Sequence, residues 1–179
     1  CTDGVAEFDL TTQRFKTLLQ GNVDAIYFNE KLYIGKREEV FVYNESTGNF
    51  DLYYHLAGKD ITLSCLHLDE KKNLWMGTTS NGLYCLSGDK KISQPVTRGN
   101  IASIYEDSSK ELWICTWEEG LYRIKTDSTI ENFRHDPKNP NSICTDFVRS
   151  CCEDNAGNLW IGTFHGLNRY EKSTGKFQL

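Results

Sequence analysis

The stretch that decides the fold is Gly157-Asn158-Leu159-Trp160-Ile161-Gly162-Thr163. A turn pair of glycine and asparagine leads into a leucine, an aromatic, a β-branched and a small residue, which is typical of a short buried strand. The same order of leucine, aromatic, apolar and small residue occurs three more times, at residues 32–35, 74–77 and 112–115. The chain is therefore built from repeats, which have to be interpreted before any single motif.

The four motifs follow one another at the period of a propeller blade. Their aromatic residues are 42, 38 and 47 residues apart, and a four-stranded blade repeats about every 40–45 residues. The surroundings repeat in the same register, because an aspartate lies six residues before each tryptophan and a second apolar run begins seven or eight residues after each aromatic. The aspartates are Asp69, Asp107 and Asp154.

Each repeat predicts four short antiparallel strands. The first strand ends at the aspartate turn, and the second strand carries the motif. The third strand is preceded by a glycine in three of the repeats, and the fourth strand closes the unit. Because one such sheet cannot bury both faces alone, successive blades must stack. We expect almost no helix, blades at about residues 22–53, 61–94, 100–134 and 145–179, and the motif aromatics buried between blades. These aromatics are Tyr33, Trp75, Trp113 and Trp160.

The first residues align with the end of a repeat. Cys1-Thr2 matches Cys115-Thr116, and the residues that follow match the third and fourth strands of a unit. Residues 1–15 are therefore predicted to form a partial blade of two strands, which gives 18 strands in all. Because 18 is not a multiple of four, the sequence predicts an all-β fragment of a larger β-propeller.

Composition narrows the function classes. The formal net charge is -5 and the lysines and arginines are not clustered, so we expect no nucleic-acid binding. No apolar run of about 18 residues is present that would cross a membrane. The seven cysteines include no pair spaced for zinc and are interpreted as small buried residues. The adjacent Cys151 and Cys152 should point to opposite faces of a strand.

The last repeat resembles a known family. Residues 139–143, 157–163, 166–170 and 174–177 are similar to the two-component regulator propeller repeat. The resemblance implies the periplasmic sensor region of a hybrid two-component histidine kinase from polysaccharide-degrading gut bacteria, with propellers of about seven blades. It also implies three kinds of partner: an oligosaccharide ligand, further propeller blades outside this sequence, and a second copy in a homodimer.

The loops that follow the motif strands contain the candidate ligand contacts. In a blade of this order they share one face with the connections between blades, where propellers commonly bind ligands. Trp117 lies outside the strand motif, and an exposed indole suits the apolar face of a sugar ring. Arg37, Glu118 and His165 occupy equivalent loops and would supply directional hydrogen bonds. The alternative is that Trp117 packs against the next blade.

No residue pattern indicates catalysis. The sequence lacks a nucleophile elbow, a dinucleotide fingerprint and a P-loop. The pairs Glu38-Glu39 and Glu118-Glu119 would point apart on an extended chain, so they are interpreted as solvated loop charges rather than glycosidase carboxylates. We expect no enzyme, no metal and no cofactor. The alternative to ligand sensing is a structural scaffold for dimerisation without a ligand site of its own, and a propeller lyase or glycosidase is the third hypothesis.

Overall fold

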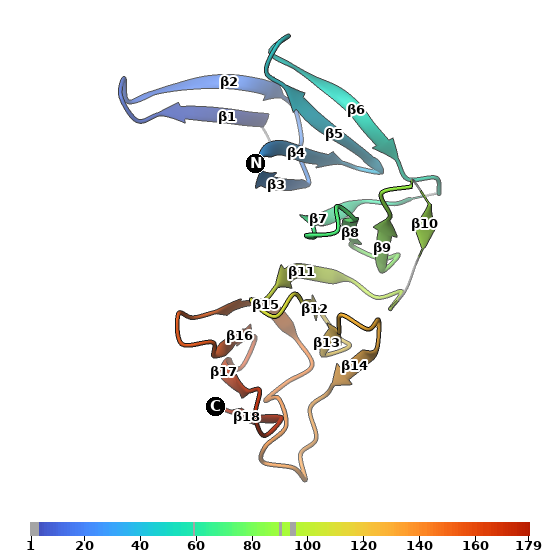
Figure 1. Ribbon diagram of the computed structural model, residues 1–179, viewed down its shortest axis with the longest axis vertical. Coiled ribbons are helices and arrows are strands. Elements are labelled where there is room, and N and C mark those ends of the chain that lie inside the picture. Colours follow the sequence, from blue (N-terminus) through green and yellow to red (C-terminus); the bar gives the residue numbers. More distant parts are fainter. Residues whose placement is uncertain (1–3, 59, 90, 94–95) are drawn as a thin grey trace.

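The computed structural model describes residues 4–58, 60–89, 91–93 and 96–179. This part of the chain forms 18 strands and no helix, as the repeats predict (Figure 1). The strands make one hairpin and four four-stranded antiparallel sheets, each of which follows the chain order from one edge to the other. The predicted all-β architecture of propeller blades is therefore confirmed.

Each four-stranded sheet is one blade, and we number the blades in chain order. The hairpin before them consists of β1 (Gly4–Asp9) and β2 (Arg14–Gln20). Blade 1 contains β3 (Ala25–Asn29), β4 (Lys31–Lys36), β5 (Glu39–Asn44) and β6 (Asn49–His55). Blade 2 contains β7 (Leu63–Leu68), β8 (Leu74–Thr78), β9 (Leu83–Leu86) and β10 (Ile92–Ser93). Blade 3 contains β11 (Ile101–Glu106), β12 (Leu112–Thr116), β13 (Leu121–Ile124) and β14 (Ile130–Phe133). Blade 4 contains β15 (Val148–Glu153), β16 (Leu159–Thr163), β17 (Gly166–Glu171) and β18 (Lys176–Gln178).

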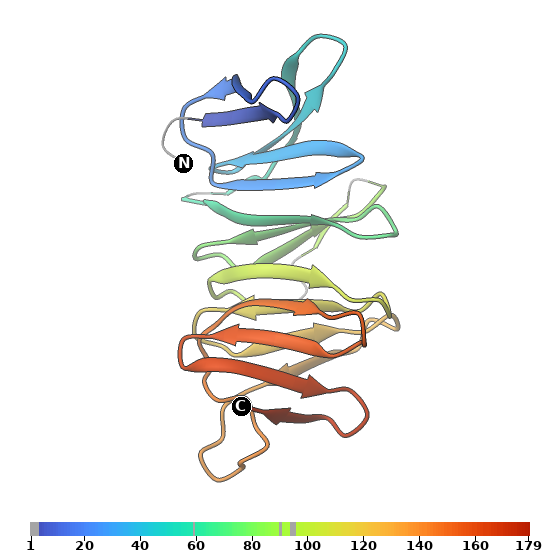
Figure 2. The ribbon, with the colours of Figure 1, turned by 90° about the vertical axis from the view of Figure 1, so that its left-hand side faces the viewer.

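The blades stack face to face in chain order and together follow an arc (Figures 1 and 2). Their first strands contact one another along the stack, β3 with β7, β7 with β11 and β11 with β15. The hairpin lies where the partial blade was expected, but its second strand continues to Gln20, past the expected limit at residue 15. The expected start of that partial blade, residues 1–3, lies outside the described residues.

Close packing between blades requires the small residue at the end of the motif. A Cβ atom at Gly77 would lie 2.5 Å from the Sγ atom of Cys65 and 2.9 Å from the Cβ atom of Ile101 in the next blade. A Cβ atom at Gly35 would lie 3.0 Å from a methyl carbon of Leu63, also in the next blade. Because such interiors leave no room for an added methyl group, a larger residue at either position would push two blades apart.

The motif aromatics of blades 1, 2 and 3 are covered by the blade that follows each of them. Trp113 is fully buried, and its ring lies 5.3 Å from the ring of Tyr170 in blade 4. Tyr33 and Trp75 are buried as predicted. The prediction is wrong for Trp160, which is only half-buried. Blade 4 is the last sheet of the chain, so no following blade covers Trp160 within the described residues.

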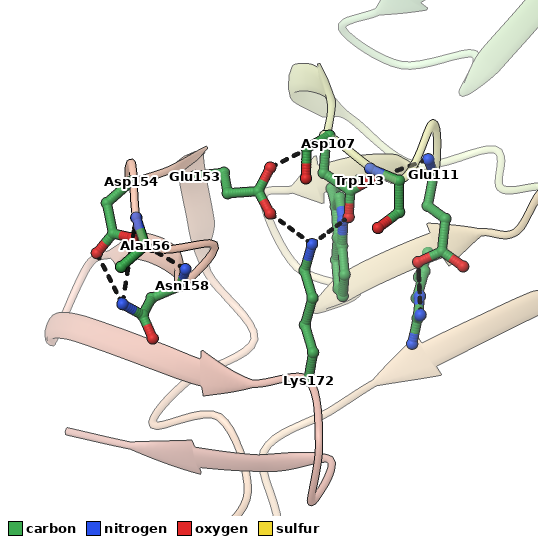
Figure 3. A network of polar contacts seen from close by, with 11 residues as sticks. Asp107, Glu111, Trp113, Glu153, Asp154, Ala156, Asn158 and Lys172 are labelled. Atoms are coloured by element: carbon green, nitrogen blue, oxygen red, sulfur yellow. Dashed lines mark hydrogen bonds and ion pairs between the residues drawn. The ribbon is translucent and has the colours of Figure 1, made fainter.

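The aspartate of each turn holds the tryptophan of its own blade. The indole Nε1–H donates to the aspartate Oδ2 atom over 2.8–3.0 Å in the pairs Trp75–Asp69, Trp113–Asp107 and Trp160–Asp154. Figure 3 shows the pair of blade 3, Trp113 and Asp107. The Oδ1 atom accepts a backbone N–H four residues on, as a turn cap should. Hydrogen bonds from Trp160 and Asn158 hold the pKa of Asp154 far below its usual range. The turn at each aspartate was predicted from the sequence, whereas the indole contact was not.

Replacing Asp69 with alanine should lower the free energy of unfolding by about 1–3 kcal/mol, because the buried indole N–H of Trp75 loses its acceptor. Urea unfolding followed by circular dichroism measures this loss. Lys71→Ala, an exposed change in the same turn, should have an effect below about 0.5 kcal/mol. Equal effects of the two substitutions would show that the aspartate–indole bond does not stabilise the blade.

The six cysteines in the described residues are free thiols. Cys85 and Cys115 are buried, Cys151 is half-buried and its neighbour Cys152 is exposed. The two adjacent residues therefore lie on opposite faces of β15, as predicted. Burial raises the pKa of the Cys65 thiol to about 12, so this group is protonated and unreactive at neutral pH.

Candidate ligand-binding site

The loops after the motif strands lie against the connections between blades, as predicted. The backbone N–H of Trp117 donates to the carbonyl oxygen of Asn100 over 3.1 Å. The equivalent bonds run from Thr79 to Thr62 over 3.0 Å and from Phe164 to Phe147 over 3.0 Å. Blades 2, 3 and 4 therefore each present a hydrogen-bonded pair of loops at the same edge, opposite the aspartate turns.

Trp117 lies at the junction of blades 3 and 4. Its side chain is half-buried, and the guanidinium carbon of Arg149 lies 4.7 Å from the centre of its ring. The ring of Phe164 is 6.4 Å away, and Arg149 also lies 5.9 Å from the centre of that ring. Trp117 thus packs against the next blade, as the alternative interpretation held, and a cation–π contact fixes its orientation.

The same indole borders a cavity of about 480 Å³. Its lining comes from the loops of blades 2 and 3: Thr79, Gly99, Asn100, Trp117, Glu118 and Glu119. The volume lies within the range of about 300–1,000 Å³ that small-molecule sites occupy. One aromatic ring beside amide and carboxylate groups is a composition that can bind a polar ligand with an apolar face.

The structure separates the two carboxylates of the pair Glu118-Glu119. Glu119 accepts hydrogen bonds from the hydroxyl groups of Thr97 and Tyr122, the latter over 3.0 Å. Burial and the Glu119 contact both raise the pKa of Tyr122, so the phenol keeps its proton and remains a donor. Glu118 is exposed, and its backbone carbonyl oxygen accepts a hydrogen bond from Arg134 over 3.1 Å. Glu119 is thus the positioned acceptor, and sequence reasoning missed it.

The other two candidate residues do not line this cavity. Arg37 lies in the β4–β5 loop of blade 1, where its backbone N–H donates to Asp24 over 2.6 Å and its side chain is largely exposed. His165 is exposed in the β16–β17 turn, and its backbone N–H donates to Thr163 over 3.3 Å. The structure therefore brings Trp117 and Glu118 together and leaves Arg37 and His165 outside.

No group of three or more histidine, cysteine, aspartate or glutamate side chains is placed to hold a metal ion in residues 4–58, 60–89, 91–93 and 96–179. Within the same ranges no helix is long and apolar enough to cross a membrane.

Comparisons with known proteins agree with the repeat structure. Residues 142–165 match the family model described as two component regulator propeller. No curated protein sequence matches the chain. Among solved structures, the extracellular domain described for a hybrid two component system of B. thetaiotaomicron superimposes with a TM-score of 0.78 at 22% identity, over 94% of this chain and 25% of that one.

Two further structures have the same fold. The extracellular domain of a second such system from B. thetaiotaomicron gives a TM-score of 0.76 at 24% identity, over 93% of this chain and 24% of that one. Virginiamycin B lyase from Staphylococcus aureus gives 0.76 at 14% identity, over 99% of this chain and 62% of that one. The chain spans about a quarter of the length of the two extracellular domains. Residues 142–165 are therefore a two-component regulator propeller repeat, set in an array of β-propeller blades with the fold of these extracellular domains.

Proposed function

We propose that this chain is part of the periplasmic sensor region of a hybrid two-component signalling protein and that it binds an oligosaccharide at the Trp117 cavity. The family repeat at residues 142–165 and the fold shared with extracellular domains of hybrid two component systems support the sensor role. The likeness to virginiamycin B lyase is one of fold alone at 14% identity, and it brings no catalytic arrangement to this chain.

The observation that carries the ligand assignment is the setting of Trp117. Arg149 and Phe164 of blade 4 hold one side of the indole, and the loop cavity of blades 2 and 3 lies beside it. A fixed aromatic ring can stack on the C–H face of a sugar at little entropic cost. Glu119, held by Thr97 and Tyr122, then accepts hydrogen bonds from sugar hydroxyls, and Asn100 can donate or accept.

The partners of the proposed whole protein are further propeller blades and a second copy of the chain. Large apolar side chains on the hairpin and blade 1 are exposed, and the missing surface of another blade or subunit would cover them. They are Phe8, Phe15, Ile26 and Phe28. This surface lies far along the chain from Trp117, so a packing role for it is compatible with ligand binding at the cavity.

Calorimetric titration of the chain with a panel of oligosaccharides tests the proposal. Trp117→Ala should weaken the binding of the responding oligosaccharide by roughly tenfold or more, because the stacking surface is lost. Trp117→Phe should keep part of the affinity, since a smaller ring can still stack.

Phe28→Ala is the matched control, because it removes an exposed aromatic side chain from blade 1 without touching the cavity. This variant should bind the oligosaccharide as the unmodified chain does. An oligosaccharide that binds Trp117→Ala and the unmodified chain equally well would show that the Trp117 cavity is not the site.

A further inference from the structure

A lysine closes the junction between blades 3 and 4. Lys172, in the β17–β18 turn, donates from its Nζ atom to Asp107 over 2.8 Å and to Glu153 over 2.7 Å (Figure 3). The side chain of Asp107 is 0% exposed and that of Glu153 is 7% exposed, so the ammonium group pairs with two buried carboxylates. The turns of two blades are thereby joined at the edge opposite the Trp117 cavity.

The junction between blades 2 and 3 repeats the carboxylates but not the lysine. Asp69 takes the place of Asp107, since each accepts the indole N–H of its own blade, over 2.9 and 3.0 Å. Glu106 takes the place of Glu153, and each accepts a backbone N–H from the aspartate turn of the preceding blade.

The position of Lys172 follows from the strand register. Arg123 pairs with Trp113 in blade 3 as Arg169 pairs with Trp160 in blade 4. Lys172 lies three residues after Arg169, and the residue three after Arg123 is Thr126. A threonine, which carries no charge and is three heavy atoms shorter than lysine along the chain, therefore replaces the bridging residue.

The space that a lysine would fill is a cavity. A volume of about 340 Å³ lies at this junction, and Asp69, Glu106 and Thr126 all line it, together with Trp75. Four residues that carry a hydroxyl group also line it: Ser87, Ser93, Thr126 and Ser128. At the junction of blades 3 and 4, the two carboxylates accept hydrogen bonds from a primary ammonium group, that of Lys172. At the junction of blades 2 and 3, the equivalent position is Thr126, so the protein does not provide an ammonium group from there.

Three lysines also line the cavity, of which two are paired with other residues and one is exposed. Lys110 pairs with Glu70 over 3.6 Å and Lys125 with Glu131 over 2.5 Å, while Lys71 is exposed at the rim. His67 lies 3.5 Å from Glu106, but its Nε2 atom makes no hydrogen bond within the described residues. Burial lowers the pKa of His67, so the imidazole does not neutralise Glu106 at pH 7.

We propose that the cavity between blades 2 and 3 binds a small hydrophilic ligand through a primary ammonium group, which lies between Asp69 and Glu106 as the Lys172 ammonium lies between Asp107 and Glu153. Asp69 already accepts from Asn73 over 2.9 Å, so Glu106 is the main acceptor. The cavity size and the four hydroxyl groups suit a single amino sugar or amino acid. This site is separate from the Trp117 cavity and does not depend on the function proposed for it.

The n-butylammonium ion, which reproduces the lysine side chain, is the probe. Titration of the chain, followed by NMR, should show one saturable site for n-butylammonium, with shifts in the turns at residues 69–73 and 125–128, and none for n-butanol. Glu106→Gln should weaken this binding roughly tenfold or more, because a charge-assisted hydrogen bond is lost. Thr126→Lys should abolish it by supplying the ammonium group from within. Thr47→Lys, which adds the same charge on an exposed turn of blade 1, should leave it unchanged.

Lys172→Ala supplies an internal reference. It vacates the equivalent position between blades 3 and 4, so n-butylammonium should bind there as well and raise the stoichiometry from one to two. Absence of saturable binding to the unmodified chain, or binding to Thr126→Lys with unchanged affinity, overturns the proposal. Both of these outcomes can be observed even where Lys172→Ala does not fold.

Discussion

Replacing Trp113 with alanine should lower the free energy of unfolding by about 3–5 kcal/mol. The side chain is 0% exposed and contacts rings of both its own blade and the next, with ring centres 5.9 Å from Phe133 and 5.3 Å from Tyr170. Its removal creates a cavity between two blades that neither blade can fill alone. It also leaves Asp107 without the indole N–H that it accepts.

Trp160 is the matched control for this substitution. It occupies the same position of the repeat and makes the same bond to its turn aspartate, but it is half-buried. Trp160→Ala should therefore cost roughly 1–2 kcal/mol. Urea unfolding of both variants by circular dichroism gives the comparison. A loss at Trp113 no larger than that at Trp160 would contradict the conclusion that stacking of the next blade stabilises the motif aromatic.

Replacing Lys172 with methionine should lower the free energy of unfolding by about 2–4 kcal/mol at pH 7. Methionine keeps most of the apolar stem and removes the charge, so Asp107 and Glu153 remain buried without a cation. The expected loss is below that of a fully buried pair, because the lysine side chain is 25% exposed. The exposed change Lys176→Met in the same blade is the control and should cost less than about 0.5 kcal/mol.

The cost of Lys172→Met should depend on pH with a definite sign. Burial by itself would raise the pKa of Asp107, but hydrogen bonds from Lys172 and Trp113 hold it below its ordinary value of 3.8. The hydrogen bond from Lys172 likewise holds the pKa of Glu153 below its ordinary value of 4.5. Because both values are lowered in the folded state, the stabilisation is complete above these ordinary values and is lost as the pH falls through the lowered ones.

Unfolding of the unmodified chain and of Lys172→Met between pH 7 and pH 3 tests this sign. The difference in unfolding free energy should be largest near neutral pH and should shrink in the acid range, where protonation relieves the unpaired carboxylates. A difference that stays constant over this range would mean that the bridge contributes packing rather than charge compensation.

The repeat could be predicted from the sequence because each blade uses the same residues for the same physical reason. The motif strand needs an aromatic residue for the next blade to cover, as at Trp113. It also needs a small residue where two blades approach closely, as at Gly77. The turn glycine is not repeated in every blade, since Lys72 and Lys110 stand at the position of Gly157. All three adopt a positive φ, of 63°, 64° and 81° respectively, so the backbone conformation is kept while the residue changes.

The site was less predictable, because it depends on contacts between repeats rather than within one. Trp117 was singled out as an aromatic outside the motif, but its partner Arg149 lies within β15 and carries no sequence signal of its own. Glu118 and Glu119 are indistinguishable in sequence, and only the positions of Thr97 and Tyr122 decide which is held. Arg37 and His165 occupy equivalent loops of other blades, and the stacking of blades places them away from the cavity.

The most direct test of oligosaccharide binding beside Trp117, on a stack of propeller blades, is the indole region of a ¹H–¹⁵N NMR spectrum. Three of the four tryptophans donate their Nε1–H to a turn aspartate, while the described residues supply no acceptor for that of Trp117. We expect three slowly exchanging indole signals that an oligosaccharide leaves in place, and a fourth, absent from Trp117→Ala, that shifts to saturation. A fourth signal that no oligosaccharide moves, or a ligand that shifts the three aspartate-bonded signals instead, would contradict this expectation.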